Sequence, residues 1–170
     1  ESIKSLYEQN MRNMLEKNTQ LCVYYKGERV VDLWATAVGD QSFSADSLVN
    51  AFSSGKSLES IAIGSLVSQD LLDYQDKVTE HWPEFGGQGK GETTIADLLR
   101  HEGGMASLDR PLNSSDLLPE NLKKHKVGKV IETHNQKFRP SGKRREYHAI
   151  TRGWVLNEVF RRVDEQNRTM

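Results

Sequence analysis

The sequence of 170 residues predicts an α+β fold in which helices flank an antiparallel sheet. An apolar stripe of helical period is followed by two short β-rich runs, and most of the chain beyond them has the periodicity of helices. We therefore expect residues 1–50 to form a helix and a β-hairpin, and residues 51–170 to form a mainly helical part. This length suffices for one ordinary domain.

The first part of the chain supplies the predicted sheet. Apolar residues recur at three- and four-residue steps over 2–17, which is typical of one face of a helix. Residues 21–25 and 29–34 are rich in β-branched and aromatic residues, and the Lys-Gly-Glu break between them indicates a hairpin turn. Residues 35–50 are expected to be a loop. Because two strands alone are marginally stable, we expect an open sheet edge that further strands would cover.

Apolar patterns and caps predict the helices of the second part. Residues 54–69 carry apolar side chains around most of a helix, so this helix is expected to be deeply buried, with Glu59 as a conspicuous charge. Thr93 or Thr94 is the expected cap of a helix over 95–101. The other expected elements are one short helix within 71–85, a flexible surface turn over 86–91, short helices and loops over 105–140, and a final helix over 150–162.

Composition excludes several classes of protein. The chain has no apolar run near eighteen residues and opens without the pattern of a signal peptide, so we expect no transmembrane segment, and no compartment is indicated. The single Cys22 cannot close an internal disulfide, and no Cys/His cluster has zinc spacing. We therefore expect neither a metal nor a cofactor.

The net charge of −1 conceals an asymmetry. Residues 1–120 contain 10 Lys and Arg and 19 Asp and Glu, whereas residues 121–170 contain 13 and 5. The basic residues are interleaved with apolar ones, so we expect the two halves to pack against each other or against a missing segment, and we expect no nucleic-acid partner. The cluster Lys123-Lys124-His125-Lys126 leaves a basic binding surface as an alternative.

The stretch from Phe52 to Ser57 has two chemical interpretations. Gly55-Lys56-Ser57 matches the end of a phosphate-binding loop, which requires GxxxxGK followed by Ser or Thr. However, Asn50 stands where that loop needs its first glycine, and no apolar strand ending in Asp follows to hold magnesium. The glycines of 86–91 also lack the strand–helix context of a nucleotide loop.

The second interpretation is the pattern Ser-x-x-Lys, formed by Ser53 and Lys56 at the start of a helix. A spacing of three residues places both side chains on one side of the helix. The positive helix end favours a developing negative charge on Ser53 and, with the apolar surroundings, disfavours a protonated Lys56. A neutral amine can accept the serine proton and make Ser53 a nucleophile. The alternative is that Ser53 or Ser54 caps the helix and Lys56 is solvated.

Three segments in order resemble the serine β-lactamase and penicillin-binding-protein superfamily, in its class C and carboxylesterase-like branch. Phe52-Ser53-Ser54-Gly55-Lys56 resembles the nucleophile motif, and TIADLLRHEGGM over 94–105 resembles the class C segment that follows it. Pro140-Ser141-Gly142 with Tyr147-His148-Ala149 resembles the second motif, a tyrosine after a Pro-Gly turn. The resemblance extends from the first hairpin to the helix that contains Trp154.

This resemblance implies a β-lactamase/transpeptidase-like fold, in which residues 1–170 are the N-terminal portion of a single domain whose C-terminal strands are missing from this chain. It implies that Ser53 attacks a carbonyl and forms an acyl-enzyme, and that Lys56 is its base, alone or with Tyr147. Tyr147 would carry the proton to the leaving group. The backbone amide of Ser53 would form half of an oxyanion hole.

The sequence departs from the family pattern at three points. The family often has Thr where this chain has Gly55, and Ala149 replaces the asparagine of the Tyr-x-Asn motif, a loss that esterase-like members tolerate. The third motif, Lys/His-x-Gly, would lie beyond Met170. We therefore expect these residues alone to be poorly stable or inactive, and to be completed by a C-terminal portion or by a second copy of the chain.

The predicted function is hydrolysis of an ester, amide or β-lactam carbonyl in a small-molecule acyl substrate. The alternative is a catalytically inactive scaffold or partner-binding protein of the same fold, with a basic C-terminal surface. Among the histidines, His101 is expected to be a structural hydrogen-bonding residue. For His148 two roles stay open, lining of the substrate cleft and packing in the interior.

Overall fold

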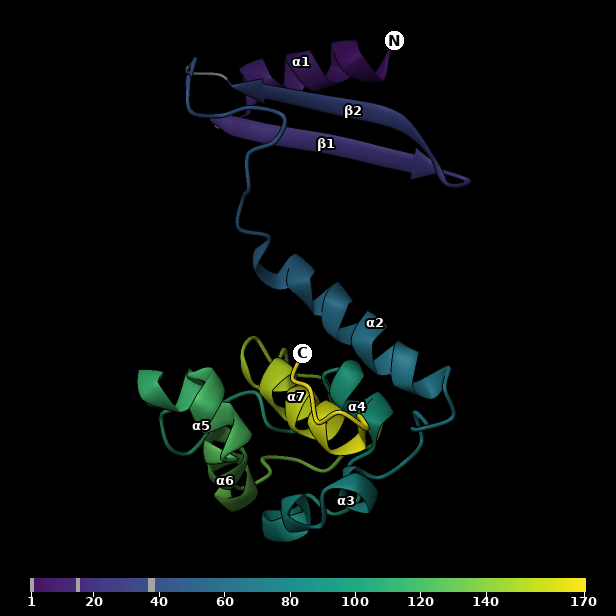
Figure 1. Cartoon of the computed structure of the whole chain (residues 1–170), viewed down its shortest axis with the longest axis vertical. Coiled ribbons are helices and arrows are strands. Elements are labelled where there is room, and N and C mark those ends of the chain that lie inside the picture. The colour runs from purple at the N-terminus through teal and green to yellow at the C-terminus, as the bar shows by residue number, and fades with distance from the viewer. Residues whose placement is uncertain (1, 15, 37–38) are drawn as a thin grey trace. The chain divides into compact units, whose positions relative to one another are not determined.

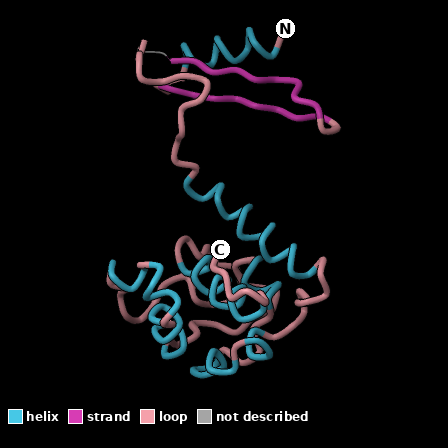
Figure 2. The backbone as a smooth tube through the Cα atoms, in the orientation of Figure 1, coloured by secondary structure: helices cyan, strands magenta, loops and turns pink. Residues whose placement is uncertain are grey.

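The computed structural model describes residues 2–14, 16–36 and 39–170. The chain divides into two compact units, residues 1–50 and 51–170. Within the described residues, the strands lie in the first unit and the second unit consists of helices and loops (Figure 2). The first unit contains α1 (Ile3–Asn13), β1 (Asn18–Tyr25) and β2 (Glu28–Thr36) (Figure 1).

The first unit is the predicted helix and hairpin. The Ser2 hydroxyl accepts a hydrogen bond from the Ser5 backbone at 3.2 Å and caps α1. The two strands pair antiparallel, with Asn18 opposite Thr36 at one end, so both are longer than expected. The prediction of a helix and hairpin is confirmed. Leu15, inside the predicted helix, and residues 37–38, inside the predicted loop, lie outside the described residues.

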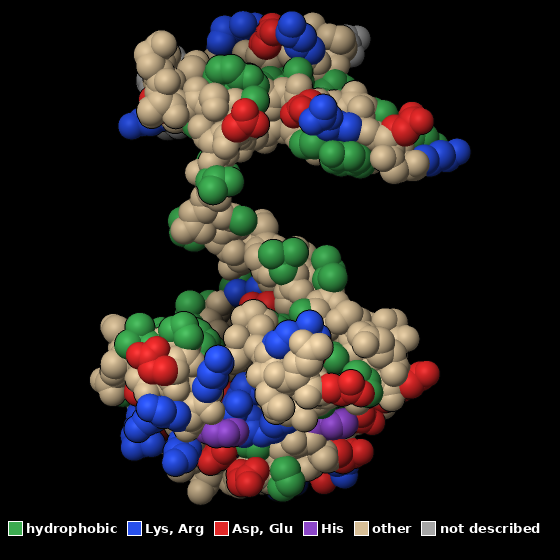
Figure 3. Space-filling view, viewed as in Figure 1, with side chains coloured by type: hydrophobic (Ala, Val, Ile, Leu, Met, Phe, Trp, Pro, Cys, Tyr) green, Lys and Arg blue, Asp and Glu red, His purple; other side chains and the backbone are tan. Residues whose placement is uncertain are grey.

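The hairpin exposes large apolar side chains. Tyr24 and Tyr25 are 64% and 63% exposed, and Trp34 is 46% exposed. Hydrophobic side chains are visible along the strands in the space-filling view (Figure 3). In the described part of the chain the sheet has these two strands, each with a free edge. The arrangement fits the expectation that further strands would cover this sheet.

The second unit is built from two helices of twelve and thirteen residues, near its start and its end, and several shorter ones between them. Its elements are 3-10 helix η1 (Phe52–Gly55), α2 (Lys56–Val67), α3 (Val78–His81), 3-10 helix η2 (Pro83–Gly89), α4 (Ile95–Leu99), 3-10 helix η3 (Ser114–Leu117), α5 (Pro119–Lys123), α6 (Lys126–Thr133) and α7 (Thr151–Val163). Thr94 caps α4 as predicted, since its hydroxyl accepts the Asp97 N–H at 3.1 Å.

Helix α7 provides the centre of the core. Val155, Leu156 and Val159 are at most 1% exposed and pack with apolar residues from the other helices of this unit. The final helix was predicted almost at its observed bounds. Trp154 and Phe160 of this helix are partly buried and pack against the core.

The sequence predicted a deeply buried helix over residues 54–69. This prediction is wrong for the corresponding helix, α2. Of its residues, Ile63 and Leu66 are buried, whereas Leu58 and Ile61 are 67% and 66% exposed. Hydrophobic side chains are visible on the α2 surface in Figure 3. The reason is that α2 packs on α7 along one side. Leu58 also lines an open, mainly apolar cavity of about 730 Å³ between α2 and α7.

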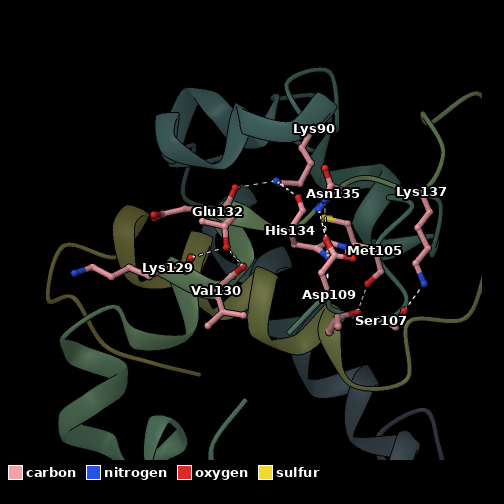
Figure 4. A network of polar contacts seen from close by, with 12 residues as sticks. Lys90, Met105, Ser107, Asp109, Lys129, Val130, Glu132, His134, Asn135 and Lys137 are labelled. Carbon is pink, nitrogen blue, oxygen red and sulfur yellow. Dashed lines mark hydrogen bonds and ion pairs between the residues drawn. The ribbon is translucent and has the colours of Figure 1, made fainter. Parts of the chain in front are cut away.

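The glycine-rich segment over 86–91 is only in part the predicted surface turn. Most of it belongs to η2, and Lys90 is fully buried. Its amine donates to the carbonyls of Glu132 and His134, at 3.1 and 2.5 Å, and so ties this segment to the end of α6 (Figure 4). Burial lowers the pKa of Lys90 to about 8. A lysine in a glycine-rich run is normally solvated, and only long-range packing makes this one internal.

Candidate active site

Ser53 lies in a tight turn at the entrance to α2. The 3-10 helix η1 leads directly into α2, and the Lys56 N–H reaches the carbonyls of Ser53 and Ser54. Gly55 is the N-cap of α2, and no side chain there makes a capping hydrogen bond. The alternative in which the side chain of Ser53 or Ser54 caps this helix is therefore wrong. The Ser53 side chain is exposed.

The backbone just before Ser53 is in an uncommon conformation. Phe52 has a φ of +44°, in the left-handed region that non-glycine residues rarely adopt. Such conformations persist where the surrounding structure imposes them, and they are concentrated at functional sites. Phe52 thus turns the chain sharply before Ser53.

His101 holds the segment that carries Tyr147. The Glu146 N–H donates to the His101 carbonyl at 3.0 Å, and the His148 N–H donates to His101 Nδ1 at 3.0 Å. The ring centres of Tyr147 and His101 are 4.7 Å apart. Tyr147 remains 53% exposed. Its backbone is therefore fixed on both sides while its ring stays accessible.

The three predicted site residues come together in the second unit. A hydrogen bond with the Ser53 side chain, together with the charge of Lys56, lowers the pKa of Tyr147 below its usual value. Lys56 Nζ lies 5.3 Å from the centre of the Tyr147 ring and donates to the Ala149 carbonyl at 2.6 Å. A hydroxyl, an amine and a phenol thus share one accessible site.

The two histidines beside Tyr147 are structural. His148 is fully buried, accepts the Met105 N–H at Nε2 over 2.9 Å, and lies with Nδ1 2.5 Å from the Glu146 carbonyl. This favours packing in the interior over lining of a cleft. Burial, followed by the charge of Arg152, lowers the pKa of His101 to about 4, so its imidazole is neutral at pH 7.

We expect three histidines whose pKa values are lowered by burial to make the fold sensitive to acid. Burial lowers the pKa of His101, His134 and His148 below the ordinary value of 6.5. Between their folded and unfolded pKa values the unfolded chain binds more protons, so the free energy of unfolding falls as pH falls. Thermal melts should show a Tm several degrees lower at pH 4.5 than at pH 7, with a smaller fall in His134→Gln. A Tm that is constant or rises toward pH 4.5 would contradict this.

Two ion pairs join the acidic and basic halves of the second unit. Arg145 lies 2.9 Å from Glu102, and Arg152 lies 3.1 Å from Glu59. The expectation that the halves pack against each other is met at these two points. Sequence analysis noted Glu59 and missed Arg152. The available signal was weak, because α7 contains Glu158, Arg161 and Arg162 besides Arg152, and nothing in the sequence pairs Arg152 with Glu59.

The described residues hold no group of three or more His, Cys, Asp or Glu side chains that could bind a metal ion. None of the helices in the described ranges combines the length and apolarity needed to cross a membrane.

A model of the Beta-lactamase family matches residues 7–170. The chain belongs to the beta-lactamase family. It is 35% identical over 146 residues to the esterase/beta-lactamase LipL of Mycobacterium tuberculosis, covering 84% of this chain and 32% of LipL. The family resemblance inferred from the three motifs is thereby confirmed.

Solved structures show the same beta-lactamase-like fold. A family VIII carboxylesterase superposes with a TM-score of 0.85 at 28% identity, covering 98% of this chain and 44% of that one. A penicillin-binding-protein homologue from Caulobacter crescentus gives 0.83 at 27% identity, with coverage of 98% and 44%. The chain therefore spans about a third to less than half of the length of these relatives. The predicted fold class is confirmed for this portion.

Proposed function

We propose that the protein is a serine hydrolase that forms an acyl-enzyme, with Ser53 as nucleophile and Lys56 and Tyr147 as proton carriers. One observation carries the proposal, namely that Ser53, Lys56 and Tyr147 meet at one accessible place: Ser53 and Lys56 lower the pKa of Tyr147, and the Lys56 amine lies 5.3 Å from the centre of its ring. A nucleophile within reach of a base is the arrangement that covalent catalysis needs.

The chemistry follows from this geometry. Ser53 Oγ would bond to the carbonyl carbon of the substrate while its proton passes to the Tyr147 phenolate or to Lys56. The carbonyl oxygen would become negative, and the Ser53 backbone amide would stabilise it. The protonated carrier would then give its proton to the leaving group, and a water molecule would hydrolyse the acyl-enzyme. A lowered pKa of Tyr147 favours this role, because the phenolate is then available more often.

We further propose an ester, amide or β-lactam carbonyl of a small molecule as the substrate. The names of LipL and of the family VIII carboxylesterase support ester substrates. Ala149 in place of an asparagine also favours esters over β-lactams. The protein as a whole would act on such a substrate without a cofactor.

A fluorophosphonate probe, which labels activated serines, tests this proposal. The assay uses the protein together with the C-terminal portion that is expected to complete the domain. This protein should be labelled with a stoichiometry near one, and an aryl ester should compete with the probe. An inactive scaffold of the same fold, the alternative that sequence analysis left open, would show no labelling.

A further inference from the structure

Arg152, in the first turn of α7, is a buried cation that contacts three segments of the second unit. It is 6% exposed. Its Nη2 donates to the Lys56 carbonyl and to Ser60 Oγ, both at 2.9 Å. Its Nη1 lies 3.4 Å from the Leu99 carbonyl and 3.5 Å from His101 Nε2. One guanidinium therefore links α2, α7 and the end of α4.

Glu59 supplies the counter-charge for Arg152. Its Oε2 lies 3.1 Å from Arg152 Nε, and both side chains are largely buried. Gly153 leaves room for this carboxylate, because a Cβ at that position would lie 2.7 Å from Glu59 Oε1. A buried ion pair of this kind contributes little net stability, because the cost of desolvating both charges offsets their attraction.

The contacts of Arg152 reach two of the proposed catalytic residues indirectly. The guanidinium holds the backbone carbonyl of Lys56, and it lies against the imidazole on which Tyr147 packs and whose Nδ1 accepts the His148 N–H. We propose that Arg152 is a positioning residue that aligns Lys56 and Tyr147 with Ser53. This inference rests on the proposed function.

The charge of Arg152 also influences the residues that its contacts position. It contributes to the lowered pKa of Tyr147, after Ser53 and Lys56, and to that of His101. A neutral His101 keeps Nδ1 as an acceptor for the His148 N–H. The titratable and charged groups that surround this site are Lys56 and Glu59 from α2, His101 after α4, Arg145, Glu146, Tyr147 and His148 before α7, and Arg152 itself.

The test separates acylation rate from binding in Arg152→Gln. At saturating fluorophosphonate the acylation rate constant should fall about 10- to 100-fold, because misplacement of reacting groups by about 1 Å costs that much. The half-saturating probe concentration should change less than about threefold. The acid limb of the pH–rate profile should move to higher pH, since Tyr147 loses a neighbouring cation. Arg152→Lys should return the acid limb of the profile to its wild-type position, because the positive charge is kept. It should restore only part of the acylation rate, because an ammonium lacks the planar, forked donors of a guanidinium.

Two further variants complete the test. Arg110→Gln removes an exposed arginine of the same unit and should leave rate and profile unchanged. If Arg152→Gln does not fold, Gly153→Ala displaces Glu59 while both charges remain, and it should slow acylation about 3- to 10-fold.

The outcomes distinguish this inference from the proposed function. If a folded Arg152→Gln protein shows the wild-type acylation rate and pH profile, the positioning role alone is overturned. The same result in Gly153→Ala has this meaning if Arg152→Gln does not fold. An unlabelled wild-type protein would overturn the proposed function, and the inference with it.

Discussion

Replacement of Ser53 by alanine is expected to lower fluorophosphonate labelling at least about a thousandfold, because it removes the only atom that could bond to phosphorus or to a carbonyl carbon in the proposed reaction. The fold should survive, because the Ser53 side chain is exposed. Labelling measured by gel fluorescence, with Tm as a check on folding, provides the comparison.

The matched control is Ser54→Ala, which removes another exposed hydroxyl one residue away. It should label within about threefold of the wild-type protein. Loss of labelling in Ser54→Ala with retention in Ser53→Ala would reverse the assignment. Equal labelling of both variants would remove Ser53 from the mechanism.

The largest expected effect on stability is that of Gly104→Ala. Gly104 has a φ of +69°, and a Cβ there would lie 2.2 Å from the Phe138 carbonyl oxygen, a backbone atom that cannot rotate away. Left-handed backbone costs a residue with a Cβ about 1 kcal/mol, and the steric overlap adds about 1–3 kcal/mol. We expect about 3 kcal/mol of lost stability, or a Tm about 10 °C lower.

Gly142→Ala isolates the backbone contribution to this effect. Gly142 has a φ of +68°, but a Cβ there would meet no atom within 4 Å. It should therefore cost only about 1 kcal/mol in denaturant unfolding. Equal losses in the two variants would show that the contact with Phe138 does not constrain the fold. The Gly104 variant should also disturb the site, because the adjacent Met105 N–H donates to His148.

Much of the fold could be predicted because its signals are local. The hairpin, the Thr94 cap and the final helix each depend on residues within one turn or one strand. Ser53, Lys56 and Tyr147 were also selected from the sequence, the first two by spacing and the third only through the family resemblance. No local signal places residue 147 next to residue 53.

The features that sequence analysis missed are long-range. The burial of Lys90 depends on carbonyls more than forty residues away, and the role of Arg152 depends on α2 and on His101. The exposure of Leu58 and Ile61 was missed for a related reason. Apolar residues all around a helix predict that it is buried on all sides. In the structure α2 packs on α7 along one side only, and Leu58 and Ile61 are exposed.

The most direct test of the central claim is to locate the acyl group. The protein would be mixed with an excess of an aryl ester, quenched in acid, digested, and sequenced by tandem mass spectrometry. The account predicts an acyl adduct on the hydroxyl of residue 53 in wild-type protein, with much less adduct in Tyr147→Phe at the same time point. An adduct on Ser54 or Ser57, or ester turnover through no covalent adduct on any serine, would contradict it.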